Sequence, residues 1–239
     1  MIDFHYAPTP NGWKVAIALE EMGLDYKTHA IRLAEGDQFK PAFLAISPNA
    51  KMPAILDHAP PEGYGPDPVP VFESGAILFY LADKTGRFLP AREDKRAMKE
   101  LDEWLFWQAA NQGPMGGQLS HFRNYAPEES RAYGFNRYHG EYDRNLGVLD
   151  NRLKDRDFIL GDYSIADMMA FPWAFIAKPL GASLDAFPNV AAWRARIKAR
   201  PAVQTAINLL KDKQNRGQHN ASNNTLLYNQ TAESLRGGA

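Results

Sequence analysis

The chain has 239 residues, with 27 Lys plus Arg against 28 Asp plus Glu, so its formal net charge is −1. This near-neutral balance argues against a dedicated nucleic-acid binder, which would carry a basic excess. There are 0 Cys, which excludes disulfide scaffolds, thiolate metal sites and catalysis by a thiol of the protein itself. Any thiol chemistry must therefore use sulfur that a ligand carries.

The sequence predicts a cytoplasmic protein that does not enter a membrane. Residues 1–6 are a short mixed run and not a cationic stretch followed by an apolar one. No window approaches the roughly 18 apolar residues that a membrane helix needs. The 6 His show no paired ligand spacing, so we expect no metal site.

The first third of the chain predicts a small α/β domain. A strand–helix–strand order at its start implies parallel pairing through a right-handed crossover, and two later adjacent strands imply a hairpin. The expected elements are strands at 1–6 and 26–31 around a helix from 11 to 23, a short helix at 38–46, strands at 53–56 and 69–72, and a helix from 74 to 86.

After residue 90 the pattern becomes helical throughout. Gly113-Pro114-Met115-Gly116-Gly117 lacks the Lys-Ser/Thr ending of a phosphate loop, so we expect a helix break there. Ser164 and Asp167 predict a capping box, and Pro172 should kink or break the helix that begins there. The expected helices are 92–112, 128–154, 165–177, 190–200 and 203–210. These patterns predict domains at 1–87 and 93–210, followed by a polar tail at 211–239 in which Leu226-Leu227-Tyr228 offers a docking cluster.

Three short segments of the α/β part are candidates for ligand binding. Pro8–Gly12 joins the first strand to the first helix, where free N–H groups favour an anion; in the purely structural interpretation Asn11 caps the helix and Thr9 lies in a turn. Pro53 opens a strand, although only about 5–6% of X–Pro bonds are cis. Glu73-Ser74 ends another strand, and helix capping alone explains Ser74.

Taken together, these segments resemble the glutathione transferase family over residues 1 to about 210. The closest likeness is to the bacterial nu-class branch of glutathione-dependent disulfide-bond oxidoreductases. The resemblance implies a thioredoxin-like N-terminal domain followed by an all-helical bundle. The motifs that carry it are Ala7-Pro8-Thr9-Pro10-Asn11-Gly12, Ser47-Pro48-Asn49, Lys51-Met52-Pro53-Ala54, Phe72-Glu73-Ser74-Gly75-Ala76-Ile77, Leu105-Phe106-Trp107-Gln108 with Gly113-Pro114-Met115, and Tyr163-Ser164-Ile165-Ala166-Asp167.

The resemblance supplies the ligand, glutathione, and a set of binding residues. With Pro53 cis by analogy, the Met52 backbone would pair with the cysteinyl unit like an added strand. Glu73 would accept from the γ-glutamyl ammonium, and Ser74 with the nearby N–H groups would hold the γ-glutamyl carboxylate. Further ligands implied are Gln38 and Lys51 for the glycyl end and peptide groups, and Arg137 on the helical side, unless Arg137 only faces solvent.

The ligand thiol would then lie near Thr9 and Asn11. A free thiol of pKa about 8.5 is only about 3% ionised at pH 7, and lowering its pKa to about 6.5 raises that fraction to roughly 75%. The shift needs about 2.7 kcal/mol, which one hydroxyl or amide donor at a helix N-terminus can supply. Thr9 is the first candidate, Asn11 the second, and Tyr6, at the end of the same strand, competes with them.

Three functions remain open at this point. The chain is a disulfide-bond reductase that uses the thiols of bound glutathione, a transferase that conjugates glutathione to an electrophile, or a non-catalytic binding protein of this family. Its expected partners are glutathione and a small disulfide or electrophile, and the resemblance also implies a homodimer. Reduction without any protein thiol would need two glutathione sulfurs, from two bound glutathione molecules or from bound oxidised glutathione.

Overall fold

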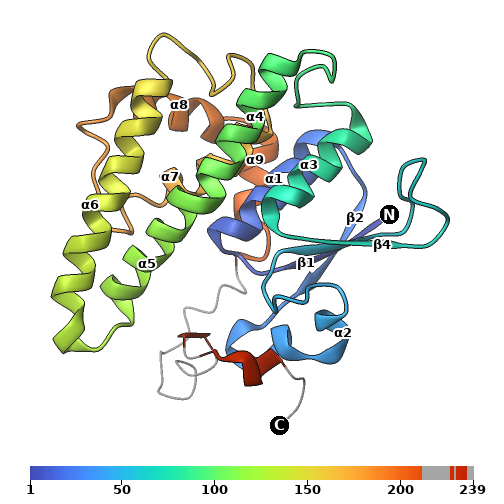
Figure 1. The fold of residues 1–239 in the computed structure, drawn as a ribbon, viewed down its shortest axis with the longest axis horizontal. Coiled ribbons are helices and arrows are strands. Elements are labelled where there is room, and N and C mark those ends of the chain that lie inside the picture. Colours follow the sequence, from blue (N-terminus) through green and yellow to red (C-terminus); the bar gives the residue numbers. More distant parts are fainter. Residues whose placement is uncertain (212–226, 229, 236–239) are drawn as a thin grey trace. The chain divides into compact units, whose positions relative to one another are not determined.

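The computed structural model of the chain describes residues 1–211, 227–228 and 230–235 (Figure 1). These residues form two compact units. The α/β unit comprises residues 1–85 and those from 205 onward, and the helical unit comprises residues 86–204. Most of the predicted polar tail, including Leu226 of its apolar cluster, lies outside the described residues. The proposed domain limits at 87 and 93 stay predictions.

A four-stranded sheet organises the α/β unit, with the strand order β2-β1-β3-β4. β1 pairs in parallel with β2, and β3 pairs antiparallel with both β1 and β4. The predicted crossover and hairpin are therefore confirmed. The strands are β1 (Ile2–Tyr6), β2 (Tyr26–Ala30), β3 (Ala54–Asp57) and β4 (Val69–Phe72).

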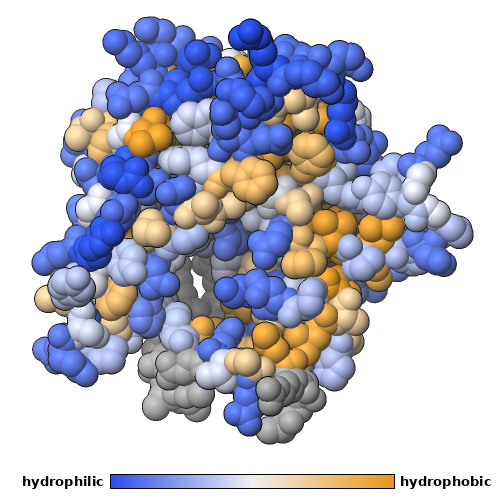
Figure 2. Space-filling model, in the orientation of Figure 1, coloured by the Kyte–Doolittle hydropathy of each residue, from blue (hydrophilic) through white to orange (hydrophobic). Residues whose placement is uncertain are grey.

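Helices cover both faces of this sheet. α1 (Pro10–Met22) and α3 (Ser74–Thr85) lie on one face, and α2 (Pro41–Leu44) lies on the other (Figure 1). The side chains of strand β1 point alternately to the two faces of the sheet, and they alternate between buried and half-buried positions. The helices on each face cover one of these two sets. His5, on the half-buried side, contacts the Phe43 ring of α2 at 5.7 Å between centroids. Hydrophobic side chains gather over the sheet and α2 on the visible face of this unit (Figure 2).

The helix predicted over residues 38–46 is wrong in detail. A 3-10 turn (Asp37–Phe39) and the short α2 stand in its place, after another 3-10 turn at Leu33–Glu35. Lys40 separates the two with an extended backbone, φ −66° and ψ 139°. The cause is Pro41, since the residue before a proline is driven out of the α-helical region.

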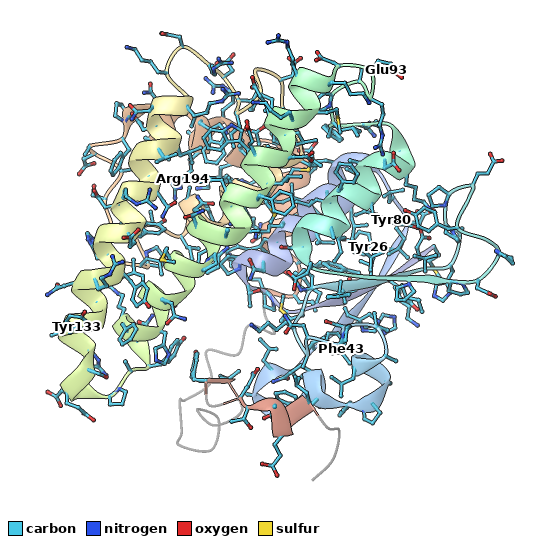
Figure 3. The ribbon with its side chains drawn as sticks, viewed as in Figure 1. Tyr26, Phe43, Tyr80, Glu93, Tyr133 and Arg194 are labelled. Carbon is cyan, nitrogen blue, oxygen red and sulfur yellow. The ribbon has the colours of Figure 1, made fainter. Side chains whose placement is uncertain are left out.

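A buried carboxylate ties β3 to α3. Asp57 is fully buried and accepts hydrogen bonds from Lys84 Nζ at 2.6 Å and from the Tyr80 hydroxyl at 2.8 Å (Tyr80 is labelled in Figure 3). Although burial opposes ionisation, the hydrogen bonds from Lys84, Ala59 and Tyr80 hold the pKa of Asp57 below its usual value. The charge is compensated, as a buried carboxylate requires.

Asp3 joins two histidines on the half-buried face of the sheet. Its carboxylate oxygens lie 2.9 Å from His29 Nε2 and 2.8 Å from His58 Nε2. Hydrogen bonds from His58, and then from His29, lower the pKa of Asp3 to about 2. A depressed folded-state pKa means that this stabilisation is present above about pH 4 and is lost as the pH falls through about 2.

We expect Asp3→Asn to lower the free energy of unfolding by about 1 kcal/mol at pH 6, a value reduced for solvent screening. The difference from the parent chain should shrink as the pH approaches 2. Urea unfolding at a series of pH values measures it. Asp25→Asn, at an exposed position just before β2, is the control and should change little; equal losses in both variants would contradict the prediction.

The helical unit contains no strand within the described residues of 86–204. Its helices are α4 (Lys95–Trp107), a π-helical turn (Gln108–Gln112), α5 (Gly113–Asn124), α6 (Glu128–Arg152), α7 (Ile165–Phe175) and α8 (Pro188–Lys198), and α9 (Pro201–Asn208) leads back into the α/β unit. No helix among the described residues is long and apolar enough to cross a membrane.

The helix break predicted at residues 113–117 is wrong. The π-helical turn leads directly into α5, which begins at Gly113. Pro114 is the second residue of α5, directly after the π-helical turn, and the helix continues past it. The glycines instead allow close packing, since a Cβ on Gly116 would lie 2.6 Å from Trp173 Cε3 of α7.

Gly116→Ala should therefore destabilise the chain by about 1–3 kcal/mol, because the added methyl group overpacks the contact with Trp173. Thermal or urea unfolding measures the effect. Gly140→Ala in α6 is the matched control, since nothing lies within 4 Å of a Cβ there. That control should gain about 0.5–1 kcal/mol from higher helix propensity, and equal effects of the two changes would refute the packing argument.

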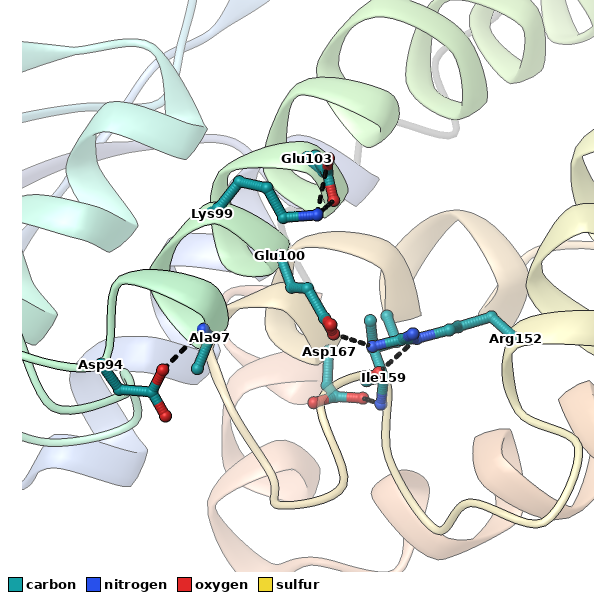
Figure 4. A network of polar contacts seen from close by, with 8 residues as sticks. All are labelled: Asp94, Ala97, Lys99, Glu100, Glu103, Arg152, Ile159 and Asp167. Atoms are coloured by element: carbon teal, nitrogen blue, oxygen red, sulfur yellow. Dashed lines mark hydrogen bonds and ion pairs between the residues drawn. The ribbon is translucent and has the colours of Figure 1, made fainter.

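The predicted capping box is confirmed at the start of α7. Ser164 Oγ accepts from the Ala166 N–H, and the buried Asp167 carboxylate accepts from the Ser164 N–H. Asp167 also accepts from the Ile159 N–H at 2.9 Å, and Arg152 bridges the Ile159 carbonyl and Glu100 (Figure 4). Helix α7 runs through Pro172 and ends at Phe175.

Candidate functional site

The turn between β1 and α1 brings Thr9 to the start of the helix. Thr9 is the N-cap, with an extended backbone, and its Oγ1 accepts from the Gly12 N–H at 3.2 Å. The interpretation of Asn11 as the cap is therefore wrong, because Pro10 starts the helix and Asn11 already lies inside it. Gly12 permits this turn, since a Cβ there would lie 2.3 Å from the Ala7 carbonyl oxygen.

The Thr9 hydroxyl also faces the segment before β3. It donates to the Sδ of Met52 at 3.6 Å, and a thioether is a weak acceptor. The Met52–Pro53 peptide bond is cis, as the family resemblance implied. Ser47 Oγ donates to the Lys51 carbonyl at 2.8 Å, while the Lys51 side chain is exposed. The turn thus places a hydroxyl donor of α1 beside the start of β3.

Glu73 and Ser74 occupy the junction between β4 and α3. Glu73 has a left-handed backbone, φ 67°, and its exposed carboxylate accepts from Asn49 Nδ2 at 3.4 Å. Its carbonyl accepts from the Ile77 N–H, so Ser74 is the first helical residue and not the N-cap that we expected. The side chain of Ser74 is buried, and its Oγ accepts from Lys14 Nζ at 3.3 Å.

Lys14 is a residue that motif reasoning missed. It lies on α1 and is only 2% exposed. Burial lowers its pKa to about 7, and the attraction of Glu73 opposes this shift. A signal was present in the sequence, because Trp13 and Val15 flank Lys14 and residues 15–19 are all apolar, and a helical segment that is apolar all round is buried.

Two residues that we predicted to bind glutathione make other contacts in the structure. Gln38 is 1% exposed; its Nε2 donates to the Leu33 carbonyl, and its Oε1 has no hydrogen-bond partner among the described residues. Arg137 lies on α6 of the helical unit, with its side chain 55% exposed and paired with Glu141 at 2.6 Å. The glutathione contacts of Gln38 and Arg137 remain predictions.

Tyr6 is part of the hydrophobic core of the α/β unit. It is fully buried, and its hydroxyl donates to the Leu209 carbonyl at 3.3 Å. Burial raises the pKa of Tyr6 above its ordinary value. These contacts favour Thr9 and Asn11 over Tyr6 as donors to a ligand.

The α/β unit therefore brings three loops to one place, joined by the contacts Thr9–Met52, Asn49–Glu73 and Lys14–Ser74. The starts of α1 and α3 supply N–H groups and partial positive charge, and Glu73 supplies a negative charge. This combination suits a small peptide that carries both an ammonium and a carboxylate. Among the described residues, no group of His, Asp and Glu is arranged to hold a metal ion.

Comparison with known proteins agrees with this geometry. The model of the glutathione S-transferase N-terminal domain matches residues 1–83, and that of the C-terminal domain matches residues 127–201. Disulfide-bond oxidoreductase YfcG of Escherichia coli (strain K12) is 45% identical over 208 residues, which cover 87% of this chain and 94% of the relative.

Solved structures extend the likeness to the whole fold. A glutathione transferase from Burkholderia graminis, with two glutathione molecules bound per subunit, is 44% identical with a TM-score of 0.80 and covers 88% of each chain. A glutathione transferase from Pseudomonas putida, with one glutathione disulfide per subunit, is 40% identical with a TM-score of 0.79, over 87% of this chain and 91% of its own. The chain belongs to the glutathione S-transferase family, with its N-terminal thioredoxin-like and C-terminal helical folds.

Proposed function

We propose that this chain is an enzyme that reduces disulfide bonds with glutathione. The observation that carries the proposal is a chain with 0 Cys whose Thr9 hydroxyl, at a helix start, faces Met52. All reactive sulfur must then come from the ligand. YfcG is named a disulfide-bond oxidoreductase, and the two structural relatives hold two glutathiones or one glutathione disulfide.

The reaction balances with two glutathiones. The thiolate of the first attacks one sulfur of the substrate disulfide, forming a mixed disulfide and releasing one substrate thiol. The thiolate of the second attacks the glutathione sulfur of that mixed disulfide, forming glutathione disulfide and releasing the other substrate thiol. Two glutathiones lose two electrons in total, and their protons end on the two product thiols.

The chain's own residues would bind glutathione and keep its thiol ionised. The Thr9 hydroxyl, now on the weakly accepting Met52 sulfur, would turn to the thiolate, with Asn11 as a second donor. The Met52 backbone ahead of β3 would pair with the cysteinyl unit. Glu73 would hold the ammonium and Ser74 the nearby carboxylate. Gln38, Lys51 and Arg137 are the further ligands in this proposal.

Turnover of two substrates tests the function. We expect the purified chain to oxidise glutathione with hydroxyethyl disulfide much faster than it conjugates glutathione to a chlorinated nitrobenzene. Efficient conjugation without disulfide reduction would identify a transferase. If glutathione at millimolar concentration does not bind at all, the chain is a non-catalytic relative and the proposal is wrong.

We further propose a cytoplasmic homodimer, as the family resemblance implied. The exposed aromatic side chain of Phe106 on α4 is of a type enriched in protein interfaces. Light scattering during size-exclusion chromatography would give twice the mass of 26.8 kDa for a dimer. A single-chain mass at micromolar concentration would contradict it.

A further inference from the structure

We infer that Lys14 is a positioning residue that makes the site select ligands carrying a carboxylate on the γ-glutamyl group, acting through Ser74. The inference rests on the proposed function and goes further, because neither the motifs nor the binding residues described above give Lys14 a role. Its basis is a contact between two buried side chains from separate elements, Lys14 Nζ to Ser74 Oγ at 3.3 Å.

The chemistry of this contact is one-directional. When Lys14 is protonated, its ammonium has three donors and no acceptor, so Ser74 Oγ accepts from Lys14. The proton of the Ser74 hydroxyl is then directed to another acceptor. Ser74 is the first residue of α3, where backbone N–H groups also face outward. A bound carboxylate would therefore meet a hydroxyl donor whose orientation Lys14 has set.

The charge of Lys14 reinforces this geometry. Burying an ammonium costs free energy unless a negative group compensates it. In the structure the attraction of the exposed Glu73 supplies part of that compensation, and burial still lowers the pKa of Lys14 to about 7. A ligand carboxylate held by Ser74 would add compensation close to the ammonium, so each charge stabilises the other. Lys14 thus favours ligands with that carboxylate over ligands without it.

Two ligands that differ by one group test the inference. Calorimetric titration would compare glutathione with 4-aminobutyryl-cysteinyl-glycine, in which hydrogen replaces the γ-glutamyl carboxylate. We expect the parent chain to prefer glutathione by about tenfold or more, the range for a hydrogen bond to a charged group. In Lys14→Met this preference should fall to about threefold or less, and Lys14→Arg should retain most of it.

The ratio of the two dissociation constants is the useful quantity, because both ligands bind the same folded fraction and partial unfolding cancels. Lys27→Met, which removes an exposed lysine of β2, is the matched control and should keep the full preference. A full preference in Lys14→Met would overturn the inference and leave the proposed function intact. If the parent chain binds neither ligand, both the proposed function and this inference are wrong. If it binds the two ligands equally, only the inferred selection for the carboxylate is wrong.

A measurement on the parent chain covers the case in which Lys14→Met does not fold. S-methylglutathione has no ionisable thiol. Proton uptake on its binding near pH 7.5 therefore measures protonation of a group on the protein. Helix α3 packs against α1, and its charged groups are Glu73 just before the first turn and Asp83 and Lys84 at the far end. Uptake that disappears with an S-methyl analogue lacking the γ-glutamyl carboxylate supports Lys14, and equal uptake with both ligands overturns it.

Discussion

Thr9→Val combined with Asn11→Ala should raise the pKa of the bound glutathione thiol by about two units, towards the free value of about 8.5. Valine keeps the shape of threonine but removes the hydroxyl that caps α1 and faces Met52. Alanine removes the only other side-chain donor proposed at this helix start. The ultraviolet absorbance of the thiolate, titrated against pH in the complex, measures the change.

The rate of disulfide reduction should fall less than the thiolate fraction does. At pH 6 that fraction would drop about 75-fold, while the less acidic thiolate is about eight times more nucleophilic, so the rate falls about tenfold. At pH 9 both enzymes carry mostly thiolate, and the difference should vanish or reverse. A pH–rate profile therefore separates thiol activation from general damage to the site.

Loss of the helix cap needs its own control, because capping contributes about 1 kcal/mol of stability. Asp94→Ala removes the cap of α4, where Asp94 accepts from the Ala97 N–H at 3.0 Å, and it lies in the helical unit. It should lose similar stability with no change in the thiol pKa. Thr9→Ser should retain both cap and activity. An unchanged thiol pKa in the double variant would contradict the proposed donors.

Asp167→Ala should destabilise the chain by about 3–5 kcal/mol, the largest stability effect that we expect. The carboxylate accepts from the Ile159 N–H at 2.9 Å, from Trp193 Nε1 at 2.8 Å, and from the N–H of Ser164 at 3.0 Å, all at buried positions. Alanine leaves these donors without an acceptor in the interior. Urea unfolding measures the loss.

Asp167→Asn keeps the shape and should cost less, about 1–3 kcal/mol at pH 7. One amide oxygen can still serve Ile159 and Trp193, but the amide nitrogen then faces the Ser164 N–H, donor against donor. Burial raises the pKa of Asp167 to about 6. With a raised folded-state pKa, the stabilisation is complete below about pH 4 and is lost as the pH rises through 6, so the gap between parent and Asn variant should shrink over that interval.

Asp185→Ala is the control for both changes, because Asp185 is exposed in the loop before α8. It should stay within about 0.5 kcal/mol of the parent chain. A comparable loss there, or a loss below about 1 kcal/mol in Asp167→Ala, would show that the buried network contributes little.

The amino-acid sequence by itself determined the order of the strands and helices in the α/β unit and the class of chemistry, whereas in the helical unit it missed α5. Alternating and helical apolar patterns, turn residues and the Ser164–Asp167 capping box are local signals, and each predicted an element that the structure contains. The absence of Cys restricts any thiol chemistry to a ligand. The family motifs are also local, which is why they could be recognised before any fold was known.

Only the tertiary structure decided which residues meet across the chain. Thr9 replaces Asn11 as the cap and reaches Met52, and Lys14 reaches Ser74 from another helix. The glycines after the π-helical turn do not end the helix; Gly116 packs against Trp173. Such contacts join residues far apart in sequence, and they depend on how side chains fill a shared interior. Spacing along one segment reports which face is apolar, but not which distant group that face will touch.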